Sequence, residues 1–335
     1  MKPRFGIGRR SDAPRDDREA LDTDYEAESD GERNVTILAS ETQSSSDAAP
    51  IRPDLGPPAP GPQAGNQPGS GLGLVISVAV SAVVFVLAIY ATGSPTANPL
   101  PLAQTTNALF WIVGVVAAAS AGAGAIYADR TAVRFADGEA ATGIRASTAW
   151  IIPVVCTATA IVLMATFHNS TMIVAGPLIA FLGNAGSLLS RDLLDDADDS
   201  AQKTATTIHA LVIHTVAFLA LSGIYLNKLP IALTSLLTAA VVSLLAVEVL
   251  ERRSILHSRR MLLSLLAGGA VAAAAVPLAW WLTHGWTGGA VLFVAFYCAV
   301  GIIQTSIERD GLRPRDAVEF GVVPFAAFIL LAVTS

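Results

Sequence analysis

The sequence predicts an all-α fold, a polytopic transmembrane helical bundle of about nine spans that follows a disordered N-terminal tail. Two compositional observations indicate this class. Hydrophobic residues make up 53% of the chain and charged residues only 14%, whereas a soluble domain carries about 25% charged residues. The charges also cluster in the first 70 residues and in short islands between long apolar runs.

The tail, residues 1–70, holds 8 Lys/Arg and 13 Asp/Glu and few apolar residues. Such a segment cannot bury enough apolar surface to offset its conformational entropy, so we expect disorder. A Pro/Gly-rich linker at 53–71 joins it to the transmembrane domain, 72–335.

One short β-prone cluster interrupts the tail at Val35, Thr36, Ile37 and Leu38. A segment of this kind can add as a strand to the edge of a partner's sheet. Residues 1–50 are therefore predicted to bind a cytoplasmic protein partner; the alternative is a solvated tail in which the cluster has no role.

Nine apolar runs are long enough to be spans, since a helix crosses the hydrocarbon core in roughly 17–25 residues. They lie near 72–91, 107–128, 148–167, 171–189, 205–225, 230–250, 261–282, 287–307 and 318–334. The first follows seventy polar residues, so we expect an uncleaved anchor and not a signal peptide. The third and fourth are separated only by "FHNS", where Asn169 and Ser170 favour a turn.

The positive charges predict the orientation. With nine spans, 20 of the 21 Lys/Arg fall on one side of the membrane and only Lys228 on the other. Because cytoplasmic loops carry the excess of Lys and Arg, the N-terminus is predicted inside and the C-terminus outside the cell membrane. Arg outnumbers Lys 18 to 3 and Ala is abundant, which suggests a bacterial source.

The loop after the fourth span reads "SRDLLDDADDS". If the helix continues, Asp192, Asp195, Asp196 and Asp199 form one stripe, and carboxylates gathered in this way can bind a divalent cation. Otherwise no cofactor is expected. "DDADD" also fits the DDxxD pattern of prenyl-diphosphate enzymes, but intramembrane prenyltransferases carry such motifs after spans two and six. The alternative interpretation is electrostatic, with helix capping and pairing to nearby arginines.

His209 and His214 lie within the fifth span, and ionisable groups in a membrane are functional candidates. Spaced five apart, they point in different directions, so we expect each to bond a neighbouring polar group instead of sharing a metal. Cys156 and Cys298 belong to no CxxC motif, which argues against a disulfide framework or a cysteine metal site.

The loop 251–260 is basic and is predicted to contact anionic lipid headgroups at the cytoplasmic face. Its four arginines are Arg252, Arg253, Arg259 and Arg260. Acid–arginine pairs also close each outside-to-inside helix: Asp129-Arg130, Arg191-Asp192, Glu251-Arg252 and Glu308-Arg309. We interpret their recurrence as the spacing of helical hairpins. Glu248 is placed to pair with Arg252, four residues on.

The segment "GIIQTSIERDGLRPRDAVEFGVV" at 301–323 resembles the C-terminal helical hairpin of uncharacterised bacterial multi-pass membrane proteins. The resemblance implies a multi-pass fold and no particular activity.

Three function classes remain open. A non-catalytic membrane subunit or scaffold with a recruiting tail is favoured, because no complete catalytic constellation is evident in the sequence. The alternatives are a transporter or channel, suggested by nine spans with Gly/Pro interruptions, and a Mg²⁺-dependent lipid-phosphate or prenyl-diphosphate enzyme using the Asp192–Asp199 loop. Nothing in the pattern indicates a nucleic-acid partner.

Overall fold

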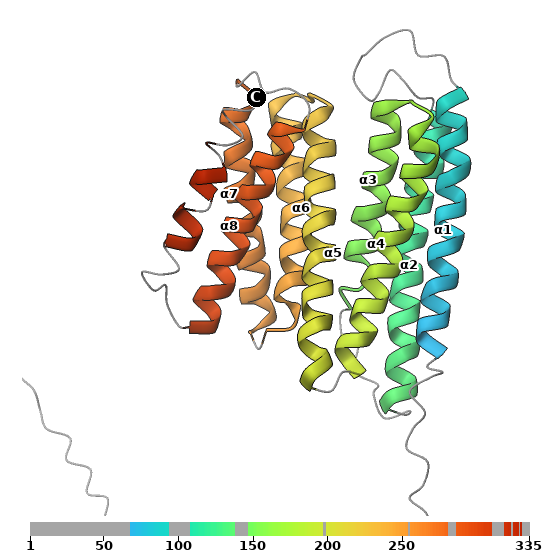
Figure 1. Ribbon diagram of the computed structural model, residues 1–335, viewed down its shortest axis with the longest axis horizontal. Coiled ribbons are helices and arrows are strands. Elements are labelled where there is room, and N and C mark those ends of the chain that lie inside the picture. The colour runs from blue at the N-terminus through green and yellow to red at the C-terminus, as the bar shows by residue number, and fades with distance from the viewer. Residues whose placement is uncertain are drawn as a thin grey trace, which may run out of the picture. The chain divides into compact units, whose positions relative to one another are not determined.

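The computed structural model describes residues 68–93, 108–137, 147–196, 199–253, 255–280, 286–309, 318–322, 324–327 and 329 (Figure 1). These residues form eight long helices: α1 (Pro68–Gly93), α2 (Ala108–Asp137), α3 (Ile151–Phe167), α4 (Thr171–Asp196), α5 (Asp199–Leu226), α6 (Ile231–Glu251), α7 (His257–Leu278) and α8 (Thr287–Arg309). A shorter apolar helix runs over Val318–Ala327. The described residues include no strand, which confirms the all-α class for this part of the chain. Residues 1–67 lie outside it, so the tail and its Val35–Leu38 cluster stay predictions.

Seven of the described helices are long and apolar enough to cross a membrane: α1, α2, α4, α5, α6, α7 and α8. The other two apolar helices, α3 and Val318–Ala327, are shorter. The 17 residues of α3 rise only about 25 Å, against a hydrocarbon core of about 30 Å. The expected count of nine spans is therefore supported only roughly.

The short helix α3 lies at the centre of the bundle. Twelve of its 17 residues are buried, and it contacts α1, α2, α4, α5 and α6. It is apolar around its whole circumference, as a helix enclosed by other helices must be. Its central place explains why it can be shorter than its neighbours.

Two apolar clusters flank α3. One, with Val84, Phe110 and Ala160, is built from α1 to α4. The other, with Leu221, Leu245 and Phe296, is built from α3 and α5 to α8. Figure 1 shows the two groups of helices side by side, with α4 and α5 next to each other where they meet.

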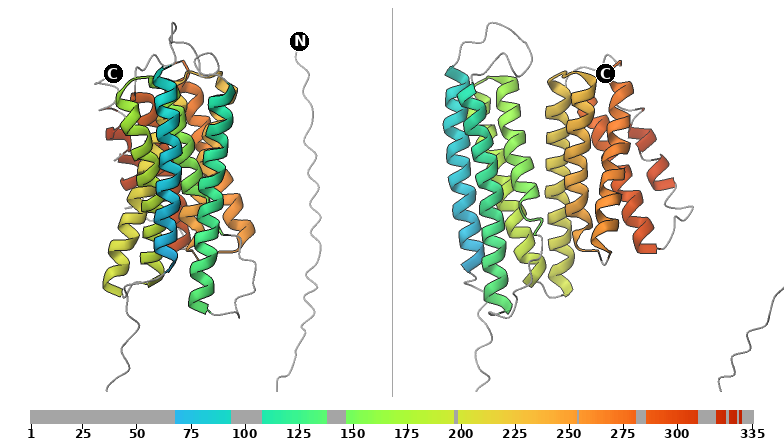
Figure 2. Two further views of the ribbon diagram at one scale, coloured as in Figure 1. Left: turned by 90° about the vertical axis from the view of Figure 1, so that its right-hand side faces the viewer. Right: turned by 180° about the vertical axis from the view of Figure 1, so that it is seen from behind.

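Large apolar side chains also cover the outside of the helices. Val86, Val115, Leu211 and Leu265 are each 65–68% exposed, and no more than half of any candidate span is buried. Soluble proteins rarely expose contiguous apolar surfaces of this extent. Contact with lipid accounts for the apolar exterior. Figure 2 shows the course of the helices in two further views.

Helix α1 lies beside α2 and α4 near its N-terminal end. Leu72 and Ile76 of α1 pack around Ala125, Ala128 and Leu188. Gly73 approaches Leu188 so closely that an added Cβ would lie 3.1 Å from its Cδ1 atom. The start of α1 is thereby held against the C-terminal parts of α2 and α4, and Figure 1 shows all three at the same end of the bundle.

Candidate functional site

A group of buried and partly buried polar side chains joins four helices at this same end. It comprises Asp129 of α2, Ser190 and Arg191 of α4, His209 of α5, Glu248 and Glu251 of α6, and Thr148 in the turn before α3. We call this set the ionic network. Its members come from chain positions more than a hundred residues apart, so only the packing of the bundle brings them together.

Arg191 is the centre of the ionic network and is only 8% exposed. Its Nε atom lies 3.1 Å from Oε1 of Glu248. One terminal nitrogen contacts Glu251, and the other lies 3.6 Å from Oδ1 of Asp129. A guanidinium offers five N–H donors in a planar fork, which lets one side chain contact carboxylates of two other helices.

Thr148 fills the space between the arginine and the two glutamates. Its hydroxyl oxygen accepts a hydrogen bond from the Nη2 atom of Arg191 at 2.8 Å. The hydroxyl also faces the carboxylates of Glu248 and Glu251. The Oγ1 atom of Thr148 lies 2.6 Å from Oε2 of Glu248. Because Thr148 lies in the turn that leads into α3, and its carbonyl oxygen accepts from the N–H of Ile151, this contact ties the start of the central helix to α4 and α6.

His209 connects α5 to the same group. Its Nδ1 atom lies 2.9 Å from the hydroxyl oxygen of Ser190, and its Nε2 atom lies 3.5 Å from Oε1 of Glu248. His209 is 8% exposed as a residue, and Ser190 is fully buried. The sequence predicted a polar partner for this histidine, and the partner is the hydroxyl of Ser190.

Charges held in this way are stable only as a group. Moving a carboxylate or guanidinium out of water costs several kcal/mol per ion, which opposite charges and hydrogen bonds at good geometry must offset. Glu248, 3% exposed, has Arg191, Thr148 and His209 around its two oxygens. Chemically, the arrangement can clamp helix ends and can exchange protons; it leaves no oxygen of Glu248 without a contact.

His214, one turn further along α5, has a different environment. Its Nδ1 atom lies 2.7 Å from the carbonyl oxygen of Ala210. The ring is surrounded by Phe293, Phe296 and Tyr297 of α8, with centroids 5.9–6.1 Å away. The two histidines therefore do not share a site.

The aspartate-rich loop falls between two helices. α4 ends at Asp196 and α5 begins at Asp199, so the four aspartates do not lie on one continuous helix. Asp192 is half-buried and has interactions of its own, whereas the side chains of Asp195, Asp196 and Asp199 lie outside the described residues. Within the described part of the chain, no group of three His, Cys, Asp or Glu is placed to hold a metal ion. A cation at this loop stays a prediction.

The predicted lipid-contacting arginines lie around the turn from α6 to α7. Arg253 pairs with Glu308 of α8, with Nη2 and Oε1 2.5 Å apart. Arg259 is exposed, and the Nε atom of Arg260 is buried with no hydrogen-bond partner among the described residues. Arg252 has contacts of its own.

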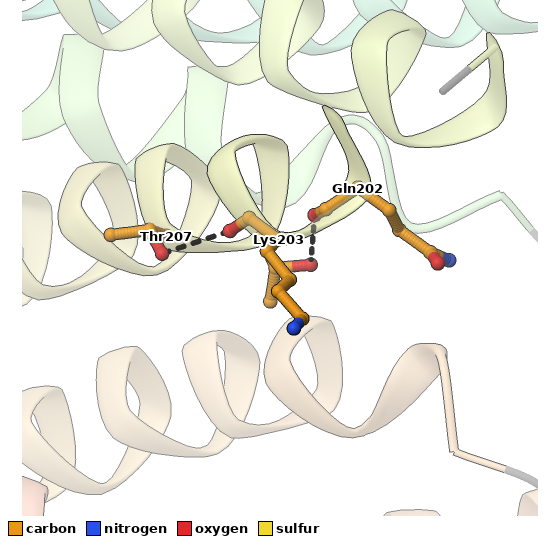
Figure 3. Close-up of a pocket in the computed structure, with 4 residues that line it drawn as sticks. Gln202, Lys203 and Thr207 are labelled. Atoms are coloured by element: carbon orange, nitrogen blue, oxygen red, sulfur yellow. Dashed lines mark hydrogen bonds between the residues drawn. The ribbon is translucent and has the colours of Figure 1, made fainter. Parts of the chain in front are cut away.

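An open groove of about 610 Å³ lies beside the first turns of α5 (Figure 3). Gln202, Lys203, Thr206 and Thr207 line it. The hydroxyls of Thr206 and Thr207 donate to the carbonyl oxygens of Gln202 and Lys203, at 2.8 and 2.9 Å. These groups satisfy one another within the helix, so the polar groups left to the groove are the amide of Gln202 and the ammonium of Lys203, on a lining that is otherwise mostly apolar.

Sequence reasoning missed most of the ionic network. Asp129, Arg191 and Glu251 belong to the acid–arginine pairs that we interpreted as hairpin spacing, and Glu248 contacts Arg191, 57 residues away, where we expected Arg252. Thr148 and Ser190 carry no sequence signal. The recurrence of the pairs at one side of the membrane was the available signal, because residues at the same ends of packed helices can meet.

Comparison with known proteins supplies a family. Residues 96–334 match the family described as "Protein of unknown function (DUF5656)". The chain belongs to this family. The matched segment of the DUF5656 protein contains α2 to α8 and every residue of the ionic network, whereas α1 and the residues before it lie outside the match. No curated protein and no solved structure matches the chain.

Proposed function

We propose that this chain is a non-catalytic subunit or scaffold of a bacterial cell membrane, with nine spans, a cytoplasmic N-terminus and an extracytoplasmic C-terminus. Its tail recruits a cytoplasmic protein through residues 1–50, with Val35–Leu38 as the pairing segment. The placement of Lys and Arg supports the orientation. The seven long apolar helices and the apolar exterior support the membrane location.

The observation that carries the proposal is the attachment of α1. This helix follows the tail in the chain, and its first turns pack against Ala125, Ala128 and Leu188. Ala128 and Leu188 stand one and two residues from the ionic network members Asp129 and Ser190. Helix α1, which lies outside the family match, is thus packed beside the ionic network that connects four other helices. This supports a role in which the bundle holds the start of α1 in place and the tail before it is free to bind a partner.

A deletion tests the recruiting role. Full-length protein is extracted gently from its own membranes and analysed by native mass spectrometry beside a variant without residues 1–60. A protein that co-purifies with the full chain and is lost on deletion supports the proposal. A matched variant, Val35→Asp with Ile37→Asp, keeps the tail length and locates the pairing segment. If the same proteins co-purify with and without the tail, recruitment by the tail is wrong.

An ion-coupled transporter is the second candidate, favoured by His209 and Glu248, which are buried in helices long enough to span a membrane. Ionisable side chains in such helices often mark ion pathways. Flux in proteoliposomes tests this candidate: proton movement in the wild type that is absent in Glu248→Gln would support it, and equal leak in both would exclude it.

A further inference from the structure

The ionic network has an imbalance of charge. Three carboxylates, those of Asp129, Glu248 and Glu251, lie within ion-pair distance of the single guanidinium of Arg191. Their side chains are 29%, 1% and 24% exposed. With His209 neutral, these groups carry two more negative charges than positive ones, and this excess attracts a further positive charge.

His209 is the group placed to supply that charge. Of the helices packed against α5, α4 brings Arg191 and α6 brings Glu248 to the ring. The one titratable residue of α3, Cys156, contacts the carbonyl of Ile179 instead. α8 meets α5 at His214 through its aromatic side chains, and its Glu308 pairs with Arg253.

Ser190 allows the ring to change protonation without losing a hydrogen bond. When His209 is neutral, the Ser190 hydroxyl donates to Nδ1, and the Nε2–H group faces Glu248. A second acceptor, the carbonyl oxygen of Ser187, lies 3.0 Å from the same hydroxyl. When Nδ1 is protonated, the hydroxyl turns to Ser187 and its oxygen accepts from Nδ1–H. Both states keep the buried groups satisfied, which avoids the penalty of an unpaired polar atom.

We propose that His209 is a proton-binding site of the bundle. One N–H bond forms at Nδ1 while one O–H bond of a hydronium ion breaks and leaves a water molecule; solvent reaches the network at the partly exposed carboxylates of Asp129 and Glu251. No other covalent bond changes, because the Ser190 O–H only rotates. The resulting imidazolium adds a second cation to the three carboxylates and strengthens the contact of α5 with α4 and α6. The inference goes beyond the proposed scaffold role and does not depend on it.

Solid-state or solution NMR of the full-length protein in lipid nanodiscs tests this directly. The five histidines are each followed by a different residue, and only His209 precedes an alanine. Labelling histidine with ¹³C and ¹⁵N and alanine with ¹⁵N therefore assigns His209 in the wild type without any substitution. His214 precedes a threonine, so a second sample with ¹⁵N-labelled threonine assigns it as the internal control.

The expected result has two parts. In the neutral form, His209 carries its proton on Nε2, whereas His214, whose Nδ1 faces a carbonyl oxygen, carries it on Nδ1. As the pH is lowered in steps, His209 gains a proton at Nδ1 while the fold persists.

Either of two results overturns the proposal. One is that His209 stays neutral at every pH at which the protein remains folded; the other is that its neutral form carries the proton on Nδ1. Both are read from the wild type alone, so the test needs no substitution. Neither result bears on whether the tail recruits a partner.

Discussion

Arg191 of α4 and Glu248 of α6 form a buried ion pair, 57 residues apart in sequence and 3.1 Å apart between Nε and Oε1. Arg191 also donates to Thr148, in the turn before α3. The pair therefore connects α4, which contributes to one apolar cluster, with α6, which contributes to the other. The contribution of this pair to the free energy of unfolding can be measured.

Replacing Arg191 by methionine leaves the carboxylate of Glu248 buried without its cation. We expect a loss of about 3–5 kcal/mol in the free energy of unfolding, as for other broken buried pairs. Arg191→Lys keeps the positive charge but not the planar set of donors of the guanidinium, so it should lower the free energy of unfolding by less. Unfolding in detergent measures both. The double variant Arg191→Met with Glu248→Gln should recover part of the loss; strictly additive effects would contradict the pair.

Thr148 is predicted to contribute through its hydroxyl and not through its methyl group. Thr148→Val keeps the shape but removes the acceptor of Arg191 and the donor to the glutamates, so we expect a loss of about 1–3 kcal/mol. Thr148→Ser retains the hydroxyl and should lose less. Thermal unfolding of the two variants side by side decides; equal stability of Val and Ser at this position would refute the contact.

Two adjacent glycines of α7 should respond in opposite ways. A Cβ atom on Gly268 would lie 2.6 Å from the backbone carbonyl oxygen of Ala239 in α6, whereas one on Gly269 meets nothing within 4 Å. Gly268→Ala must separate α6 from α7, at a cost of about 1–3 kcal/mol. Gly269→Ala should be neutral or gain about 0.5–1 kcal/mol in helix stability. Unfolding curves of the pair test the packing, and a destabilised Gly269→Ala would contradict it.

We expect His168 to make the protein less stable in mild acid. It lies in the turn between α3 and α4 with a left-handed backbone (φ 40°), and burial lowers its pKa below the ordinary value of 6.5. Its protonation is disfavoured in the folded state. The contribution of neutral His168 to the free energy of unfolding is therefore full above about pH 6.5, and it declines as the pH falls from there through the folded-state pKa.

The matched variant is His168→Asn, since asparagine tolerates the left-handed conformation. Between about pH 7.5 and about pH 5, the wild type should lose more melting temperature than this variant does. Parallel curves would show that His168 is not the group responsible.

Arg260 is predicted to bind the phosphate of an anionic lipid, because its buried Nε atom has no hydrogen-bond partner among the described residues. Arg260→Gln should reduce retention of anionic lipid in native mass spectrometry, by about 1 kcal/mol in binding. Lys228→Gln, at the opposite end and stacked over Tyr225, is the control. Equal losses in both variants would indicate non-specific attraction.

Some features followed from local pattern. Apolar runs separated by charged islands are enough to place helices, because each run must satisfy its backbone hydrogen bonds within itself in lipid. Asn169 and Ser170 were expected to form a turn, and they lie in the short connection between Phe167, where α3 ends, and Thr171, where α4 begins. α3 is the element that local pattern described least well: its apolar run does not reveal that it is central and enclosed.

The sequence by itself determined the helical class, the family and the separation of apolar from charged segments, since these depend on neighbours in the chain. The tertiary structure decided which of the end-of-helix charges meet. Asp129, Arg191 and Glu251 look alike in sequence to other acid–arginine pairs, and only the packing of α2, α4 and α6 around α3 places them within reach of one guanidinium. Charge pairing acts over a few ångströms in space, and no spacing along the chain encodes that distance.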